Sequence, residues 1–108
     1  MIEAKFKQSK SGDYVSFEIS GHAGSGPFGY DIVCAAVSAL SINTVNSINQ
    51  LAEYIPLVES ESGYLYFERL QELSDEQIRV TNLLVESLLI GLKAIETDNK
   101  TFIKTQSE

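Results

Sequence analysis

The spacing of apolar residues changes once in the first half of the chain, and this change limits the possible folds. Residues 2–7 and 15–20 alternate apolar and polar side chains, which predicts two half-buried strands. The turn residues Ser11-Gly12-Asp13 between them predict an antiparallel hairpin. From Asp31 onward, apolar residues recur every three or four positions, which is typical of a helix. The chain therefore has to pack a helix against a sheet.

The rest of the chain repeats this alternation of hairpin and helix. The first helix is expected to begin at Ile32 after an Asp31 N-cap and to end before Pro56. Its predicted buried stripe is Val33, Val37, Leu40, Thr44, Ile48, Leu51 and Ile55. A second hairpin is expected from 57–60 and 64–70. Ser74 and Gln77 form a capping-box pattern that opens a second helix. Its predicted buried stripe is Ile78, Thr81, Val85, Leu88, Leu92 and Ile95, and Thr101–Thr105 follows as a last strand.

The element order is strand, strand, helix, strand, strand, helix, strand. It predicts one small α+β domain over residues 1–108, in which two long helices pack on an antiparallel or mixed sheet of about five strands. A chain of 108 residues is of ordinary size for one domain.

Composition excludes several kinds of site and partner. One cysteine allows no internal disulfide, and one histidine cannot complete a Cys/His zinc site, so we expect neither metal nor cofactor. A net charge of -7, with eight basic residues scattered among fifteen acidic ones, argues against direct nucleic-acid binding. The acidity serves solubility or attracts a basic protein partner. Neither a signal-peptide core nor an apolar run of about 20 residues is evident, so we expect a cytoplasmic protein away from the membrane.

The only histidine and the only cysteine flank one glycine-rich segment. His22 follows the second predicted strand, and Cys34 lies in the first turn of the predicted helix. With Asp31 as N-cap, Cys34 would be the third helical residue, where free N–H groups and the helix dipole stabilise a thiolate or an oxyanion. A nearby imidazole would transfer the proton. This arrangement predicts a thiol nucleophile.

Simpler interpretations of the same residues stay open. Cys34 lies in an apolar stretch and suits a structural buried thiol, while His22 suits a surface or capping role. Asp31 either caps the helix or orients the histidine. Ser38 either bonds the sulfur or bonds back to the carbonyl of Cys34. The spacing Gly24-x-Gly26-x-x-Gly29 resembles a dinucleotide loop but follows an antiparallel hairpin, so it receives little weight.

Two segments together resemble a known family. Gly21-His22-Ala23-Gly24 and residues 29–38, Gly-Tyr-Asp-Ile-Val-Cys-Ala-Ala-Val-Ser, closely resemble the ribosomal-processing cysteine proteases of the Prp family. The resemblance extends over the whole chain. It implies a catalytic dyad of Cys34 and His22. The supporting and substrate-binding positions that it implies are Gly21, Ala23, Gly24, Asp31 and Ser38.

The resemblance also implies a substrate and an assembly. The expected substrate is the N-terminal extension of a basic large-subunit ribosomal protein, cut after an aromatic residue and before small ones. The expected assembly is a homodimer whose glycine-rich loop orders over the peptide. The alternatives are a non-catalytic acidic module that binds a basic ribosomal protein, and a redox-sensing thiol, which the lack of a resolving cysteine disfavours.

Overall fold

The structure is a computed structural model that describes residues 1–21 and 28–108, with the backbone alone for 28–31. The elements along the chain are β1 (Ile2–Gln8), β2 (Tyr14–Ser20), α1 (Phe28–Leu51), β3 (Leu57–Glu61), β4 (Tyr64–Glu68), α2 (Asp75–Asp98) and β5 (Ile103–Ser107). The predicted α+β class and element order are confirmed.

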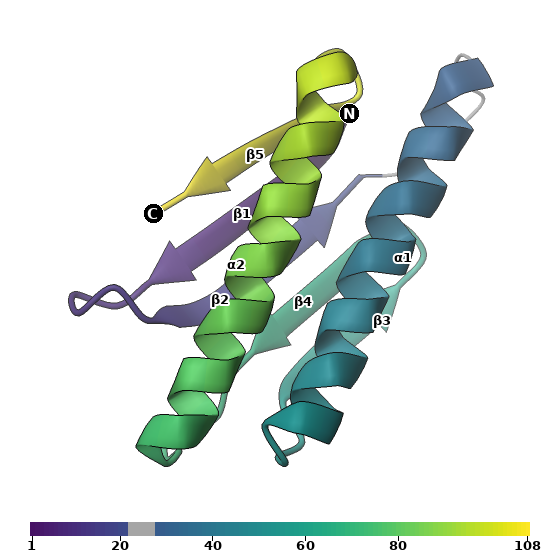
Figure 1. Ribbon diagram of the computed structural model, residues 1–108. Coiled ribbons are helices and arrows are strands. Elements are labelled where there is room, and N and C mark those ends of the chain that lie inside the picture. The colour runs from purple at the N-terminus through teal and green to yellow at the C-terminus, as the bar shows by residue number, and fades with distance from the viewer. Residues whose placement is uncertain (22–27) are drawn as a thin grey trace.

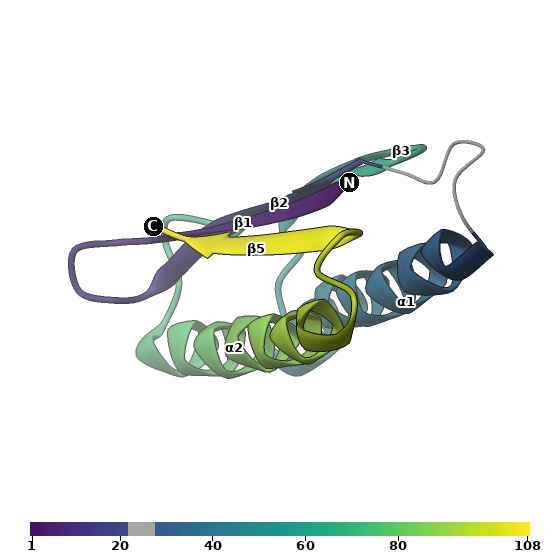
Figure 2. The ribbon, with the colours of Figure 1, turned by 90° about the horizontal axis from the view of Figure 1, so that it is seen from above.

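The strands form one mixed sheet in the order β3-β4-β2-β1-β5. Strand β5 runs parallel to β1, whereas the other neighbours are antiparallel. Both helices lie side by side on one face of the sheet, as Figures 1 and 2 show, so the described residues form two layers and place no helix on the other sheet face.

The core lies between the helices and the sheet, and an aromatic row marks its centre. Phe6, Phe17 and Phe67 stand opposite one another on β1, β2 and β4. The Phe17 and Phe67 rings stack with centroids 4.8 Å apart. All three are buried together with Val85 and Leu92 of α2. The period-two pattern therefore placed the correct side chains toward the helices.

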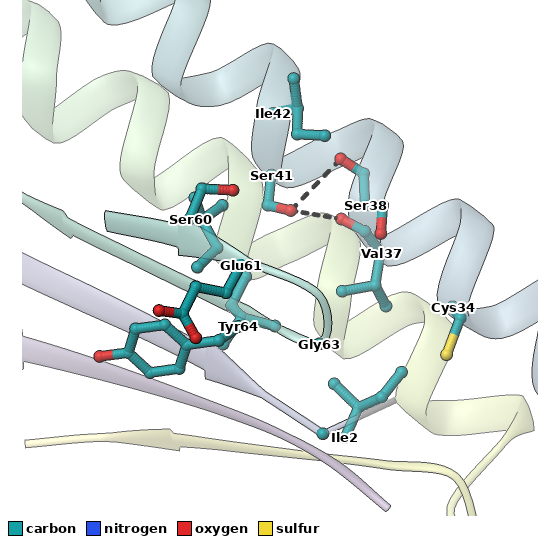
Figure 3. A pocket seen from close by; sticks show the side chains of 13 residues that line it. Ile2, Cys34, Val37, Ser38, Ser41, Ile42, Ser60, Glu61, Gly63 and Tyr64 are labelled. Atoms are coloured by element: carbon teal, nitrogen blue, oxygen red, sulfur yellow. Dashed lines mark hydrogen bonds between the residues drawn. The ribbon is translucent and has the colours of Figure 1, made fainter. Parts of the chain in front are cut away.

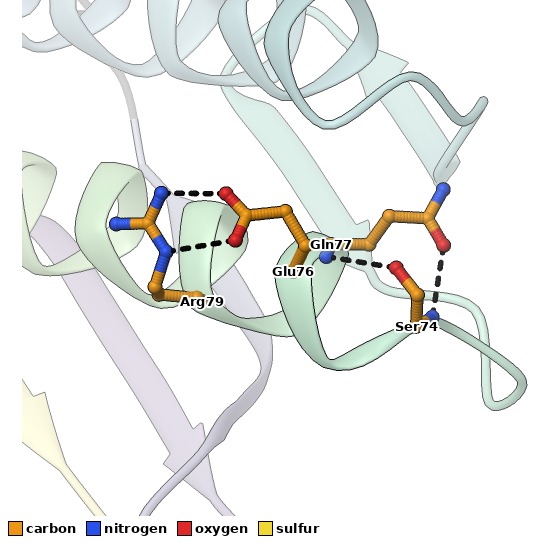
Figure 4. Close-up of polar contacts among 4 residues, drawn as sticks. All are labelled: Ser74, Glu76, Gln77 and Arg79. Carbon is orange, nitrogen blue, oxygen red and sulfur yellow. Dashed lines mark hydrogen bonds and ion pairs between the residues drawn. The ribbon is translucent and has the colours of Figure 1, made fainter.

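Helix α2 begins at the predicted capping box (Figure 4). The Gln77 N–H donates to Ser74 Oγ at 3.1 Å, and the Ser74 N–H donates to Gln77 Oε1 at 2.9 Å. The Gln77 amide also donates to the carbonyl of Ala52, which joins the start of α2 to the end of α1. The neighbouring ion pair between Arg79 and Glu76 is exposed and contributes little to stability.

Helix α1 differs from its prediction at both ends. It begins at Phe28 rather than Ile32, directly after Pro27 in the sequence, and proline favours the start of a helix. It ends at Leu51 rather than before Pro56, because the chain turns away through Glu53 with φ of 59°. On either side of Glu53, Ala52 and Tyr54 are buried in place of the predicted Leu51 and Ile55.

The buried stripe of α1 was therefore partly wrong. Val33, Val37, Thr44 and Ile48 are buried as predicted. Leu40, Leu51 and Ile55 are exposed, whereas Ser41 is buried.

Part of α1 is also long and apolar enough to span a membrane, which the sequence interpretation missed. Ile32–Leu51 is 20 residues long with a mean hydropathy of 1.3. The core helix of a soluble protein can have the same length and composition. Because Val33, Val37 and Ile48 pack into the core, the apolar character of this helix has a structural explanation inside the fold.

Candidate active site

Cys34 lines a cavity between α1 and the sheet (Figure 3). The cavity measures about 170 Å³ and opens to solvent. Its walls come from α1, from the start of β1, from the end of β2 and from the hairpin of β3 and β4; its lining residues are Ile2, Ile19, Gly21, Cys34, Val37, Ser38, Ser41, Ile42, Ser60, Glu61, Gly63, Tyr64 and Leu65. The thiol is partly buried and unpaired. A nucleophile at the wall of an open cavity can reach a bound substrate, which a thiol enclosed in the core cannot.

Gly21 brings the chain to the same cavity from the end of β2. Its N–H donates to the carbonyl of Gly63 at 2.9 Å, and its φ of 101° lies in the region that favours glycine. A Cβ on this residue would stand 2.3 Å from the Met1 carbonyl oxygen. Gly21 is thus confined both by its backbone angle and by its close approach to β1.

We expect Gly21→Ala to lower the free energy of unfolding by about 2–3 kcal/mol, because the side chain combines an unfavourable φ with a backbone clash. Thermal unfolding measures this loss. Gly91→Ala is the matched control, since its new Cβ would meet only the flexible end of Leu40 at 3.0 Å and alanine favours a helix. A Gly21→Ala protein as stable as wild type would contradict the account of this turn.

The position of Cys34 within its helix corrects the expected thiolate and oxyanion site. Since α1 begins at Phe28, Cys34 is its seventh residue rather than its third. The backbone N–H groups without intrahelical acceptors belong to the first four residues. The Cys34 amide is therefore not one of the free donors at the helix start. Asp31 is not the N-cap but lies in the first turn, where a negative charge is favourable.

The structure brings together some of the predicted site residues. Cys34, Gly21 and Ser38 line one cavity, and Ser38 lies at its exposed rim. The hydroxyl that bonds back along the helix is that of the buried Ser41, which donates to the carbonyl of Val37 at 2.6 Å (Figure 3). His22, Ala23 and Gly24 lie outside the described residues, as does the side chain of Asp31, so their predicted roles stay predictions.

Sequence patterns missed the far wall of the cavity. Glu61 and Tyr64 flank the turn between β3 and β4 and line the cavity on the side opposite α1, while their side chains point away from Cys34 (Figure 3). They come from a hairpin more than twenty residues beyond Cys34 in the sequence, so no local pattern links them to it. Among the described residues, no group of three His, Cys, Asp or Glu side chains is arranged to hold a metal ion.

The sequence and the fold match one protein family. The model of the cysteine protease Prp family matches residues 1–104. The chain belongs to the Prp family. It is 37% identical to the ribosomal processing cysteine protease Prp of Bacillus subtilis (strain 168) over 102 residues, which are 93% of this chain and 91% of that relative. Prp of Staphylococcus aureus (strain Mu50 / ATCC 700699) is 28% identical over 100 residues, with 91% of each chain covered.

Solved structures with the same fold support the assignment to the Prp family. The crystal structure of the essential ribosomal processing protease Prp from S. aureus, in complex with a covalently linked product peptide, matches with a TM-score of 0.84 at 26% identity and covers 100% of both chains. SMU.848 from Streptococcus mutans also matches with a TM-score of 0.84, at 35% identity over 99% of this chain and 93% of that one. The protein is therefore a cysteine protease of a ribosomal-processing family.

Proposed function

We propose that the protein removes an N-terminal extension from a large-subunit ribosomal protein, with Cys34 as nucleophile and His22 as acid and base. The observation that supports this most directly is the single cysteine of the chain at the wall of an open cavity. Gly21 lines the same cavity and directly precedes His22.

The proposed reaction proceeds through a thioester. The Cys34 sulfur forms a bond to the scissile carbonyl carbon, and the carbon–nitrogen bond breaks as the leaving amine takes a proton from His22. Water then attacks the thioester and gives a proton to His22, and the Cys34 sulfur leaves. The new amine and carboxyl ends are the products. Water and the two side chains supply every proton that this sequence needs.

The charge of the protein supports a basic substrate. A ribosomal protein that contacts RNA carries Lys and Arg, and the net charge of -7 on this chain favours encounter with such a partner. The proposed location is the cytoplasm, where a reducing environment keeps a lone thiol free.

The proposed assembly is a homodimer. Seven large apolar side chains along α1, the loop after it and the edge strand β3 are exposed: Ile32, Leu40, Ile42, Leu51, Ile55, Leu57 and Val58. Exposed apolar residues in such number on adjoining elements are typical of a surface that another chain covers. This supports the dimer without identifying its axis.

The test is incubation of the purified protein with a ribosomal protein precursor that carries its N-terminal extension, read by intact mass. The expected result is one cut that releases the extension. An uncut precursor that co-purifies with the protein would instead favour the acidic binding module. An uncut precursor that does not bind would contradict both functions.

A further inference from the structure

On the sheet face opposite the two helices, most acidic and basic side chains lie on different strands. The side chains that alternate along the strands with the buried aromatic row lie on this face. Four of its acidic residues, Glu18, Glu59, Glu61 and Glu68, lie on β2, β3 and β4, where no lysine lies, while Lys5, Lys7 and Lys104 lie on β1 and β5 together with Glu3. We define the acidic face as the half formed by Glu18, Glu59, Glu61, Glu68, Tyr64 and Tyr66. An acidic coat that serves only solubility requires no such separation.

The strand register sets these residues in adjacent rows. Glu59 stands opposite Tyr66, which stands opposite Glu18. In the next row along the strands, Glu61 stands opposite Tyr64. Directly opposed side chains in antiparallel strands lie about 5 Å apart at Cβ, so the acidic face is continuous across three strands.

Glu18 stands opposite Lys5 of β1, but no carboxylate of the acidic face forms an ion pair with a described residue. The one ion pair within residues 1–21 and 28–108 joins Glu76 to Arg79, away from this face. The Tyr64 hydroxyl donates to Glu18 at 3.0 Å, and the Tyr66 hydroxyl donates to Glu68 at 2.6 Å.

The two phenols remain hydrogen-bond donors at neutral pH. Burial, followed by the bond to Glu18, raises the pKa of Tyr64. The bond to Glu68, followed by burial, raises the pKa of Tyr66. The carboxylate oxygens that accept these bonds have further lone pairs for a cationic ligand.

The acidic face is continuous with the cavity at Cys34. Glu61 and Tyr64 belong to both, since they line the cavity and occupy the last row of the face (Figure 3). A polypeptide held at Cys34 can therefore continue over the β3–β4 turn and along the open sheet. Tyrosine rings beside carboxylates suit the aliphatic stem and the charged end of lysine or arginine.

We propose that the acidic face binds a lysine- or arginine-rich segment of the polypeptide whose scissile bond lies at Cys34. The inference rests on the proposed protease function and adds where the basic part of the substrate is held. The segment is distinct from the residues at the scissile bond. Its binding therefore raises the affinity for the substrate and the rate of encounter, and leaves the chemical step unchanged.

The test compares two peptides with the same residues around the scissile bond, one with a lysine-rich segment and one with glutamine at each of those lysines. The variant Glu18→Gln/Glu59→Gln/Glu68→Gln removes three charges from the acidic face and keeps both tyrosine acceptors. The control Glu72→Gln/Asp75→Asn/Asp98→Asn removes three charges from the region of α2. Both variants leave Glu61 and Cys34 in place.

For the wild type, we expect kcat/KM to be about tenfold higher for the lysine peptide at low salt, since each exposed charge contact contributes modestly. The preference should disappear in the acidic-face variant, persist in the control, and weaken near 1 M salt, where the Debye length is about 3 Å. Equal cleavage of both peptides by the wild type would overturn the acidic-face proposal and leave the protease function intact.

A binding measurement separates the two proposals if neither peptide is cut. Cys34→Ala protein should bind fluorescent lysine peptide more tightly than its glutamine partner, and the three acidic-face substitutions should abolish the difference. If those substitutions leave peptide binding unchanged but alter the sedimentation coefficient, the face is an interface between copies of the chain and the proposal is wrong.

Discussion

Cys34→Ala should lower the rate of precursor cleavage by about 10³-fold or more while the protein stays folded. The proposed mechanism has no second nucleophile, and loss of the attacking group removes the covalent pathway entirely. The fold should tolerate the change because the thiol is only partly buried and alanine favours a helix. Single-turnover cleavage and a thermal melt measure the two effects, and the melting temperature should fall by about 4 °C or less.

Ser38→Ala provides the matched control for this variant. Ser38 lines the same cavity one helical turn after Cys34, and the substitution removes one exposed hydroxyl from the rim. We expect a much smaller loss of activity than at Cys34. A Cys34→Ala protein that cuts as fast as wild type would show that the thiol is structural, as the apolar surroundings of this cysteine would otherwise suggest.

His22→Ala should lower kcat/KM by about 10²–10⁴-fold, the range in which a positioned acid and base contributes to catalysis. It should also slow the reaction of Cys34 with iodoacetamide, because the imidazole no longer accepts the thiol proton. The alkylation rate separates a catalytic role from a structural one, since a histidine that only supports the turn would not change the reactivity of the thiol.

His22→Gln is the companion variant for that experiment. Glutamine can replace a structural hydrogen bond but cannot transfer a proton at neutral pH. We therefore expect His22→Gln to be as inactive as His22→Ala. Recovery of wild-type cleavage in His22→Gln would assign the histidine to structure and require another base.

Local patterns predicted most of the fold, since they report which side of an element is buried. The alternation along β1 and β2 placed Phe6 and Phe17 in the core, and the capping box located the start of α2 at Ser74. The local patterns could not predict which strands pair with one another. The parallel contact of β5 with β1 joins the two ends of the chain, and no short pattern encodes a partner so distant in sequence.

The ends of α1 show how a local pattern can mislead. The spacing of Leu51 and Ile55 continued the apolar stripe, but the chain leaves the helix at Leu51 and exposes both side chains. A periodic pattern of apolar residues cannot predict that Glu53 adopts a left-handed backbone conformation, because that conformation depends on the tertiary path of the loop. The early start at Phe28 had the larger consequence, since it removed Cys34 from the first turn.

The residues of the candidate site also fall into two groups: those that the local sequence could indicate and those that only the folded structure brings to the site. Cys34 and His22 stood out as single residues of reactive type on either side of a glycine-rich segment, and family resemblance assigned their roles. The sequence could not identify Glu61 and Tyr64 as residues of the site, because only the folded sheet brings the β3–β4 turn opposite α1.

The central claim is that Cys34 forms a covalent bond to the substrate. The most direct measurement is the intact mass of the protein. The reaction contains enzyme in excess over precursor and is quenched with acid within the first turnover. We predict that wild-type protein gains the mass of the released N-terminal segment minus water, that peptide mapping places it on Cys34, and that Cys34→Ala gains nothing. Cleavage by the wild type with an equal mass gain on Cys34→Ala protein, or with an adduct on any other residue, would contradict the assignment of Cys34 as nucleophile.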